Sequence, residues 1–66
     1  MRIWRVRPKG CGERWLVISP DSAVTEFVTG GRAIEFGRQR AMEAHEVLMI
    51  YSEDERVFSS EDFRLH

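Results

Sequence analysis

The stretch TGGRAIEFGRQRAMEA, residues 29–44, decides the fold because it carries the clearest helical pattern in the chain. Small or apolar residues recur at the spacing of one helical face, namely Ala33, Gly37, Ala41, Ala44 and Leu48. Thr29 precedes the first turn, where a threonine oxygen accepts a hydrogen bond from a free backbone N–H. Glycine costs about 1 kcal/mol relative to alanine inside a helix. Gly37 therefore indicates close packing of this helix on a sheet, against Trp4 or Trp15.

Two apolar runs before the helix predict a β-hairpin. Residues 2–8 alternate, and their two faces carry Trp4 and Val6 on one side and Ile3, Arg5 and Arg7 on the other. Residues 14–19 are apolar on both faces, with Trp15 and Val17 opposite Leu16 and Ile18. Pro8 ends the first strand or lies at an edge, because proline has no N–H for a central ladder. Residues 23–28 predict a short third strand.

The glycines on either side of Cys11 predict the turn of this hairpin, since glycine adopts positive φ angles without strain. A phosphate-binding glycine loop runs from a strand into a helix, whereas this loop runs from strand to strand. Lys9 and Arg14 lie near Cys11 and could lower a thiol pKa. No histidine base lies close in the sequence, so we expect no nucleophilic role for this cysteine.

Two further strands are expected after the helix, at residues 46–52 and 56–59, joined by the polar turn Glu53-Asp54-Glu55. The chain is thus predicted to be a single domain, residues 1–66, of the α+β class. The expected architecture is a small antiparallel sheet of three to five strands packed on one helix, in the order β-β-(β)-α-β-β.

Three stretches resemble a family of short bacterial and phage proteins, the domain of unknown function twenty-one eighty-eight. The matching stretches are RWLVIS, AIEFGRQRAMEA and EVLMIYSEDERVFSSEDF, and together they span most of the chain. Where that family carries Asp-Gly-Arg in the last turn, this chain has Asp54-Glu55-Arg56. The resemblance implies a β-β-α-β-β fold and a bacterial or phage origin. It implies no established activity and no functional residues.

Composition excludes several kinds of site. One cysteine makes no internal disulfide, and one cysteine with two distant histidines makes no zinc set. No apolar run reaches the roughly 20 residues of a membrane span, and we see no signal peptide, so a cytoplasmic location is expected. His45 is read as a residue at the helix end, and the Glu53–Glu55 turn as solvated rather than calcium-binding. We expect no enzyme activity, catalytic residue, metal, cofactor or small-molecule substrate.

The net charge of −1 hides an uneven distribution. Residues 1–14 carry five bases and one acid, whereas residues 43–66 carry seven acids and two bases. The two ends are therefore expected to attract each other, within one chain or between two.

A single helix covers one face of a sheet, so apolar residues on both faces of the strands predict an uncovered surface. We therefore expect a binding module that acts through protein–protein interaction, including self-association. The candidate interaction surface comprises Trp4, Arg5, Arg7, Trp15, Val17, Met49 and Tyr51. Alternatively, the tail folds over that face with Phe63 and Leu65. A second function stays open, nucleic-acid binding by the basic, aromatic first strand, Arg2–Lys9, although the isoelectric point near 6.1 is low for such modules.

Overall fold

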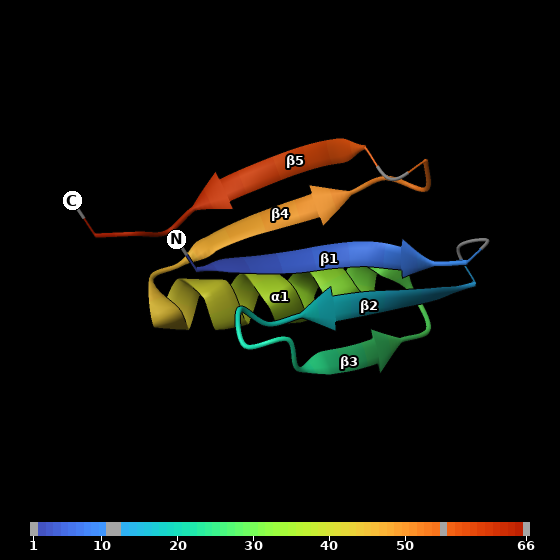
Figure 1. The fold of residues 1–66 in the computed structure, drawn as a ribbon, viewed down its shortest axis with the longest axis horizontal. Helices are drawn as coiled ribbons and strands as arrows, with labels where there is room; N and C mark the ends of the chain where they lie inside the picture. The colour runs from blue at the N-terminus through green and yellow to red at the C-terminus, as the bar shows by residue number, and fades with distance from the viewer. Residues whose placement is uncertain (1, 11–12, 55, 66) are drawn as a thin grey trace.

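The computed structural model describes residues 2–10, 13–54 and 56–65. Its elements are β1 (Ile3–Lys9), β2 (Arg14–Ile18), β3 (Val24–Phe27), α1 (Gly30–Ala44), β4 (Val47–Tyr51) and β5 (Val57–Asp62). The strands form one five-stranded sheet in the order β3-β2-β1-β4-β5, with α1 packed on one face (Figure 1). The predicted α+β class and element order are confirmed.

The sheet is mixed and not purely antiparallel as expected, because β1 and β4 run parallel while the other neighbouring strands are antiparallel. After the β1-β2-β3 meander, α1 carries the chain back to the end of the sheet where β1 begins (Figure 1). The chain therefore enters β4 in the same direction as β1. The two strands then pair from Ile3–Val47 to Val6–Ile50.

Both helix ends are capped by local chemistry. The Thr29 hydroxyl accepts a hydrogen bond from the backbone N–H of Arg32 at 3.2 Å, as its position in the sequence predicts. At the other end His45 adopts a left-handed conformation, with φ of 54°, and its N–H donates to the carbonyls of Ala41 and Met42. Such a residue ends a helix by satisfying carbonyls that have no further helical partner. His45 is therefore the C-cap.

The core lies between α1 and the three middle strands. It is formed by the buried residues Val6, Val17, Ala33, Ala41, Leu48 and Ile50. A Cβ placed on Gly37 would lie 2.9 Å from Val6 Cγ2 and 3.2 Å from Leu48 Cδ1. The predicted close approach at this glycine is thus confirmed, but the partners are aliphatic. Trp15 instead packs over Gly30, where an added Cβ would lie 2.9 Å from the indole ring.

The first two strands form the predicted hairpin, with Lys9 opposite Arg14. Gly10 has a φ of 61°, which explains the glycine at the start of the turn. The sequence raised the question of a nucleophilic role for Cys11, but this residue lies outside the described residues. Glu55 and His66 also lie outside them. The ladder between β1 and β4 ends at Val6, so Pro8 lies where β1 has a strand on one side only.

The C-terminal segment is more ordered than the sequence suggests. Strand β5 continues to Asp62, three residues beyond the predicted end. Phe63 packs at the margin of the core, and its backbone N–H donates to the Glu46 carbonyl at 3.2 Å. Leu65 is 77% exposed. The alternative in which Phe63 and Leu65 cover the second face of the sheet is therefore wrong.

Candidate interaction surface

The face of the sheet opposite α1, here called the open face, has no described element over it (Figure 1). Side chains alternate between the two faces of a strand. Since Val6, Val17 and Leu48 face the helix, the odd-numbered residues of β1 and β4 and the even-numbered residues of β2 lie on the open face. Its central members are Ile3, Arg5, Arg7, Leu16, Ile18, Val47, Met49 and Tyr51.

The centre of the open face combines cations with apolar side chains. The register places Arg5 between Ile18 of β2 and Met49 of β4. Arg7 lies opposite Leu16 on the same face. Arg5 is exposed, whereas the four others are half-buried, although no second layer covers them. Long arginine side chains cover apolar neighbours with their methylene stems in this way and keep the charged head in water.

The predicted surface residues do not all lie together. Arg5, Arg7, Met49 and Tyr51 share the open face, whereas Trp4, Trp15 and Val17 lie on the face covered by α1. Val17 is only 1% exposed, so its inclusion in a surface was wrong.

Trp4 and Trp15 are partly buried against the core. The indole N–H of Trp4 donates to Glu46 Oε1 at 2.8 Å, so its one polar group is bound within the chain. These two tryptophans therefore contribute to packing around α1 rather than to the open face.

The predicted surface combined Arg5 and Arg7 with Trp15 and Val17, which lie on the other face of the sheet. Because Lys9 pairs with Arg14, Arg5 lies opposite Ile18 and Arg7 opposite Leu16. The signal was the short hairpin loop, since a loop of fixed length sets the register and hence the face of every residue. Leu16 and Ile18 of β2, together with Ile3 and Val47, are the members of the surface that were missed.

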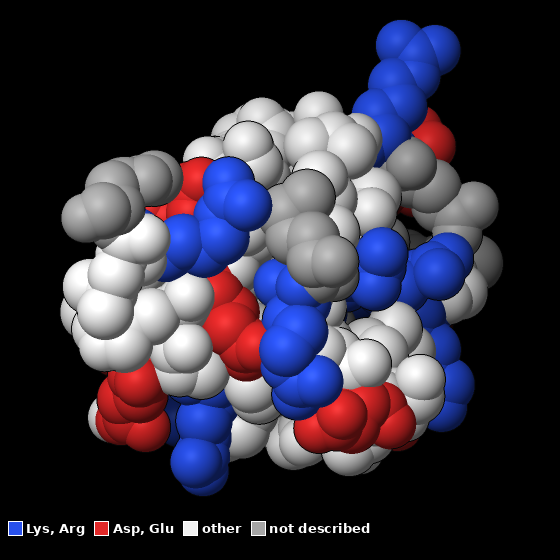
Figure 2. Space-filling model, turned by 60° about the vertical axis from the view of Figure 1, so that its left-hand side comes forward, with Lys and Arg blue, Asp and Glu red and all other residues white. Residues whose placement is uncertain are grey.

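Most charges of the basic first segment are paired within the chain. Arg2 contacts Asp21 at 3.1 Å and also binds Glu46, an acid of the C-terminal segment. The hydrogen bonds that Arg2 donates to these two carboxylates, that to Asp21 foremost, raise the pKa of Arg2 above its usual value. Lys9 contacts Glu26 at 3.3 Å and Arg14 contacts it at 3.6 Å. The end of the molecule turned forward in Figure 2 accordingly shows basic and acidic side chains interspersed.

Arg5 differs from these residues. Within residues 2–10, 13–54 and 56–65, its guanidinium has no carboxylate partner. An exposed cation between two apolar residues, with no internal counter-charge, is suited to meet an external anionic group. The predicted attraction between the chain ends is thus realised at Arg2 and Glu46, and it leaves Arg5 available.

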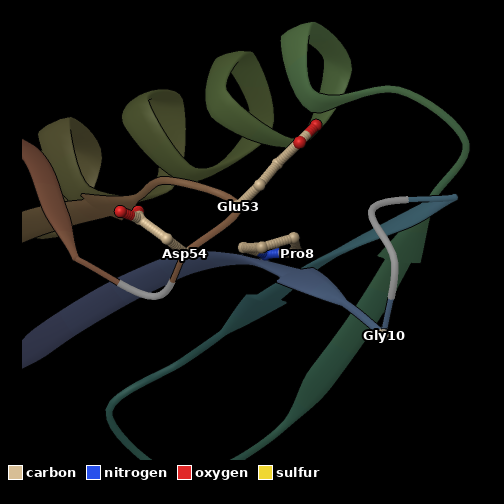
Figure 3. A pocket seen from close by; sticks show the side chains of 4 residues that line it. All are labelled: Pro8, Gly10, Glu53 and Asp54. Carbon is tan, nitrogen blue, oxygen red and sulfur yellow. The ribbon is translucent and has the colours of Figure 1, made fainter.

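The acidic turn after β4 borders a groove of about 360 Å³ lined by Pro8, Gly10, Glu53 and Asp54. Figure 3 shows the two carboxylates directed away from each other. Asp54 accepts a hydrogen bond from the Ser52 hydroxyl, which lowers the pKa of this carboxyl. Arg56 lies 3.4 Å from the same carboxylate. The groove therefore holds an internally bonded turn rather than converging ligands.

The described part of the chain contains neither a metal-binding cluster nor a membrane-spanning helix. Its histidines, acids and other donors form no group of three placed to hold a metal ion. Its helix is neither long enough nor apolar enough to cross a membrane.

No family model, curated protein or solved structure matches the chain, and the resemblance to the domain of unknown function twenty-one eighty-eight stays a prediction.

Proposed function

We propose that the protein is a non-enzymatic binding module that acts through protein–protein interaction on the open face of its sheet. One observation carries the proposal: Arg5, exposed and without a carboxylate partner among the described residues, lies between Ile18 and Met49 at the centre of that face. Apolar contacts around a cation favour a partner that offers carboxylates beside apolar groups. A chain of this size also has little room for a catalytic pocket beside its core.

Self-association is part of the proposal. Because of the charges on the open face, its dependence on salt should differ from that of binding to an acidic partner. Two copies stacked symmetrically through their open faces would bring arginines close to arginines, which is repulsive. Salt screens this repulsion and leaves apolar burial intact, so such a dimer should strengthen with salt. Sedimentation velocity at low and high salt measures this directly. An acidic partner should show the opposite salt dependence.

We further propose a cytoplasmic location. It is supported by the single cysteine, because disulfide-dependent domains of this size belong to oxidising compartments.

Nucleic-acid binding is the second candidate, favoured by the presence of Arg5, Arg7 and Tyr51 on one face. A sheet with arginines and an aromatic residue can hold phosphates and stack an unpaired base. Titration of a labelled single-stranded oligonucleotide tests this candidate. Binding should weaken steeply with salt, with a slope of about −0.7 per phosphate contact. Tyr51→Ala should weaken it further if stacking contributes.

A pull-down from nuclease-treated lysate tests the main proposal with wild type, Arg5→Glu and Arg32→Glu. The last variant is the matched control, because Arg32 is also an exposed arginine without a carboxylate partner in the described chain but lies on α1. We expect a protein that is captured by wild type and by Arg32→Glu but lost with Arg5→Glu. Equal capture by all three variants would refute an open-face site, and loss of all partners on nuclease treatment would favour nucleic acid.

A further inference from the structure

Strand β3 forms one outer edge of the sheet, so one side of its backbone has no neighbouring strand. Such an edge presents a row of N–H and C=O groups that can pair with an added strand. Its pairing with β2 is regular from Val24 to Phe27. The opposite edge, β5, has a register shift opposite Ile50 and Tyr51, and such irregularities blunt an edge. Strand β3 shows no such shift along its four residues.

Two grooves flank the end of β3 on opposite faces of the sheet. The first, about 240 Å³, lies between β3 and α1 and is lined by Phe27, Arg32, Glu35, Phe36 and Gln39. The second, about 310 Å³, is lined by Arg14, Glu26, Phe27 and Val28. Successive side chains of a strand point to opposite faces. A strand added beside β3 would therefore direct alternate side chains into these two grooves.

The first groove joins an aromatic floor to a cationic rim. The rings of Phe27 and Phe36 lie 5.1 Å apart between centroids, and the Arg40 guanidinium lies 5.0 Å from the centre of the Phe36 ring. Arg32 is exposed, and its guanidinium has no carboxylate partner among the described residues. Among the described residues of the lining, Glu35 is the single acid and Arg32 the single base. The groove thus suits an apolar side chain next to a carboxylate.

We propose that β3 and α1 form a strand-addition site for an extended peptide segment of another protein. The segment pairs its backbone with the free edge of β3, places an apolar side chain against Phe27 and Phe36, and pairs a neighbouring carboxylate with Arg32. Main-chain hydrogen bonds give affinity in this mode of recognition, and the grooves give specificity. The second groove borders the open face, but the site does not include Arg5 and does not depend on the function of that face.

The test uses a phage-displayed library of linear peptides panned against the full chain. The most enriched peptide is synthesised and titrated against isotope-labelled wild type, Arg32→Glu and Arg5→Glu. Backbone amide exchange is measured with and without the peptide. We expect enriched sequences in which apolar residues flank an acidic residue, together with slowed exchange of β3 amides. Arg32→Glu should weaken binding by about tenfold or more, as loss of a charge-assisted hydrogen bond predicts, and Arg5→Glu should not.

Three results would overturn the proposal. They are the absence of any enriched peptide, a peptide that binds without slowing exchange of β3 amides, and equal weakening by both arginine variants. Concentration-dependent protection of β3 without peptide would also overturn it, because the edge would then be occupied by a second copy. If only the expected effect of Arg5→Glu on capture in the pull-down were not observed, the open-face proposal alone would be refuted. The two proposals therefore fail separately.

Discussion

Replacement of Gly37 by alanine tests how closely α1 lies on the sheet. Helix propensity alone predicts a gain of about 1 kcal/mol. The new Cβ would lie 2.9 Å from Val6 Cγ2 and 3.2 Å from Leu48 Cδ1, and both of these side chains are fully buried. Overpacking of a well-packed core costs about 1–3 kcal/mol, and valine is too short and stiff to move aside. We therefore expect a net loss of about 1 kcal/mol.

Urea and thermal unfolding measure this loss, with tryptophan fluorescence as the signal. In a domain of this size a loss of 1 kcal/mol lowers Tm by about 4–8 °C. Gly31→Ala is the matched control in the same helix, because nothing lies within 4 Å of its added Cβ. It should stabilise the protein by about 0.4–1 kcal/mol. If Gly37→Ala were as stable as wild type, the close approach would be wrong. In a Val6→Ala background the penalty should largely disappear, since the clashing methyl is absent.

Three further changes probe the helix ends and one ion pair, each by urea unfolding. Thr29→Ala removes the hydroxyl that accepts from Arg32 N–H and should cost about 1 kcal/mol; an unchanged midpoint would contradict the cap. His45→Gly should stabilise by about 1 kcal/mol, because glycine adopts the observed left-handed conformation without strain. The Arg38 hydrogen bond lowers the pKa of Glu61 below 4.5, so their interaction stabilises above that pH and is lost as pH falls through the folded-state pKa. Glu61→Gln should therefore cost about 0.5 kcal/mol at neutral pH and nothing at pH well below 4.5.

The elements that the sequence predicts best are those specified by local chemistry. The helix follows from its small-residue face and the cap at Thr29, and the hairpin follows from two apolar runs around glycines. The two faces of β1 were also predicted, because alternation of side chains is a local property. Each of these features depends on residues a few positions apart.

The features that the sequence did not predict depend on distant contacts. Nothing within residues 47–51 indicates that β4 pairs in parallel with β1, since β-propensity carries no information about the neighbour. Strand β5 runs through Ser59-Ser60-Glu61-Asp62, which are weak strand formers. Pairing with β4 orders this segment, and Glu61 is held from the helix side by Arg38 at 2.7 Å. The tertiary contacts therefore override the local preference.

The candidate surface also separates what local sequence predicts from what distant contacts determine. Choosing Arg5 and Arg7 required only alternation along one strand, and the choice agrees with their position on the open face. Choosing their neighbours on β2 required the register between two strands; none was predicted, and the chosen Trp15 and Val17 lie on the other face. A shift of one residue moves every side chain of a strand to the other face. A correct list of strands therefore gives a wrong surface when the register between the strands is not known.

Ion pairing locates exposed binding groups on this protein better than net charge does. A formal charge of −1 suggests no preference for anionic partners. Yet the acids of the described chain are largely placed beside particular bases, and these pairs leave Arg5 on the open face and Arg32 beside β3 without carboxylates. Because these two arginines lie on different elements, charge reversal at each should affect one surface and spare the other. Loss of both activities by either single variant would instead mean that one partner spans both surfaces.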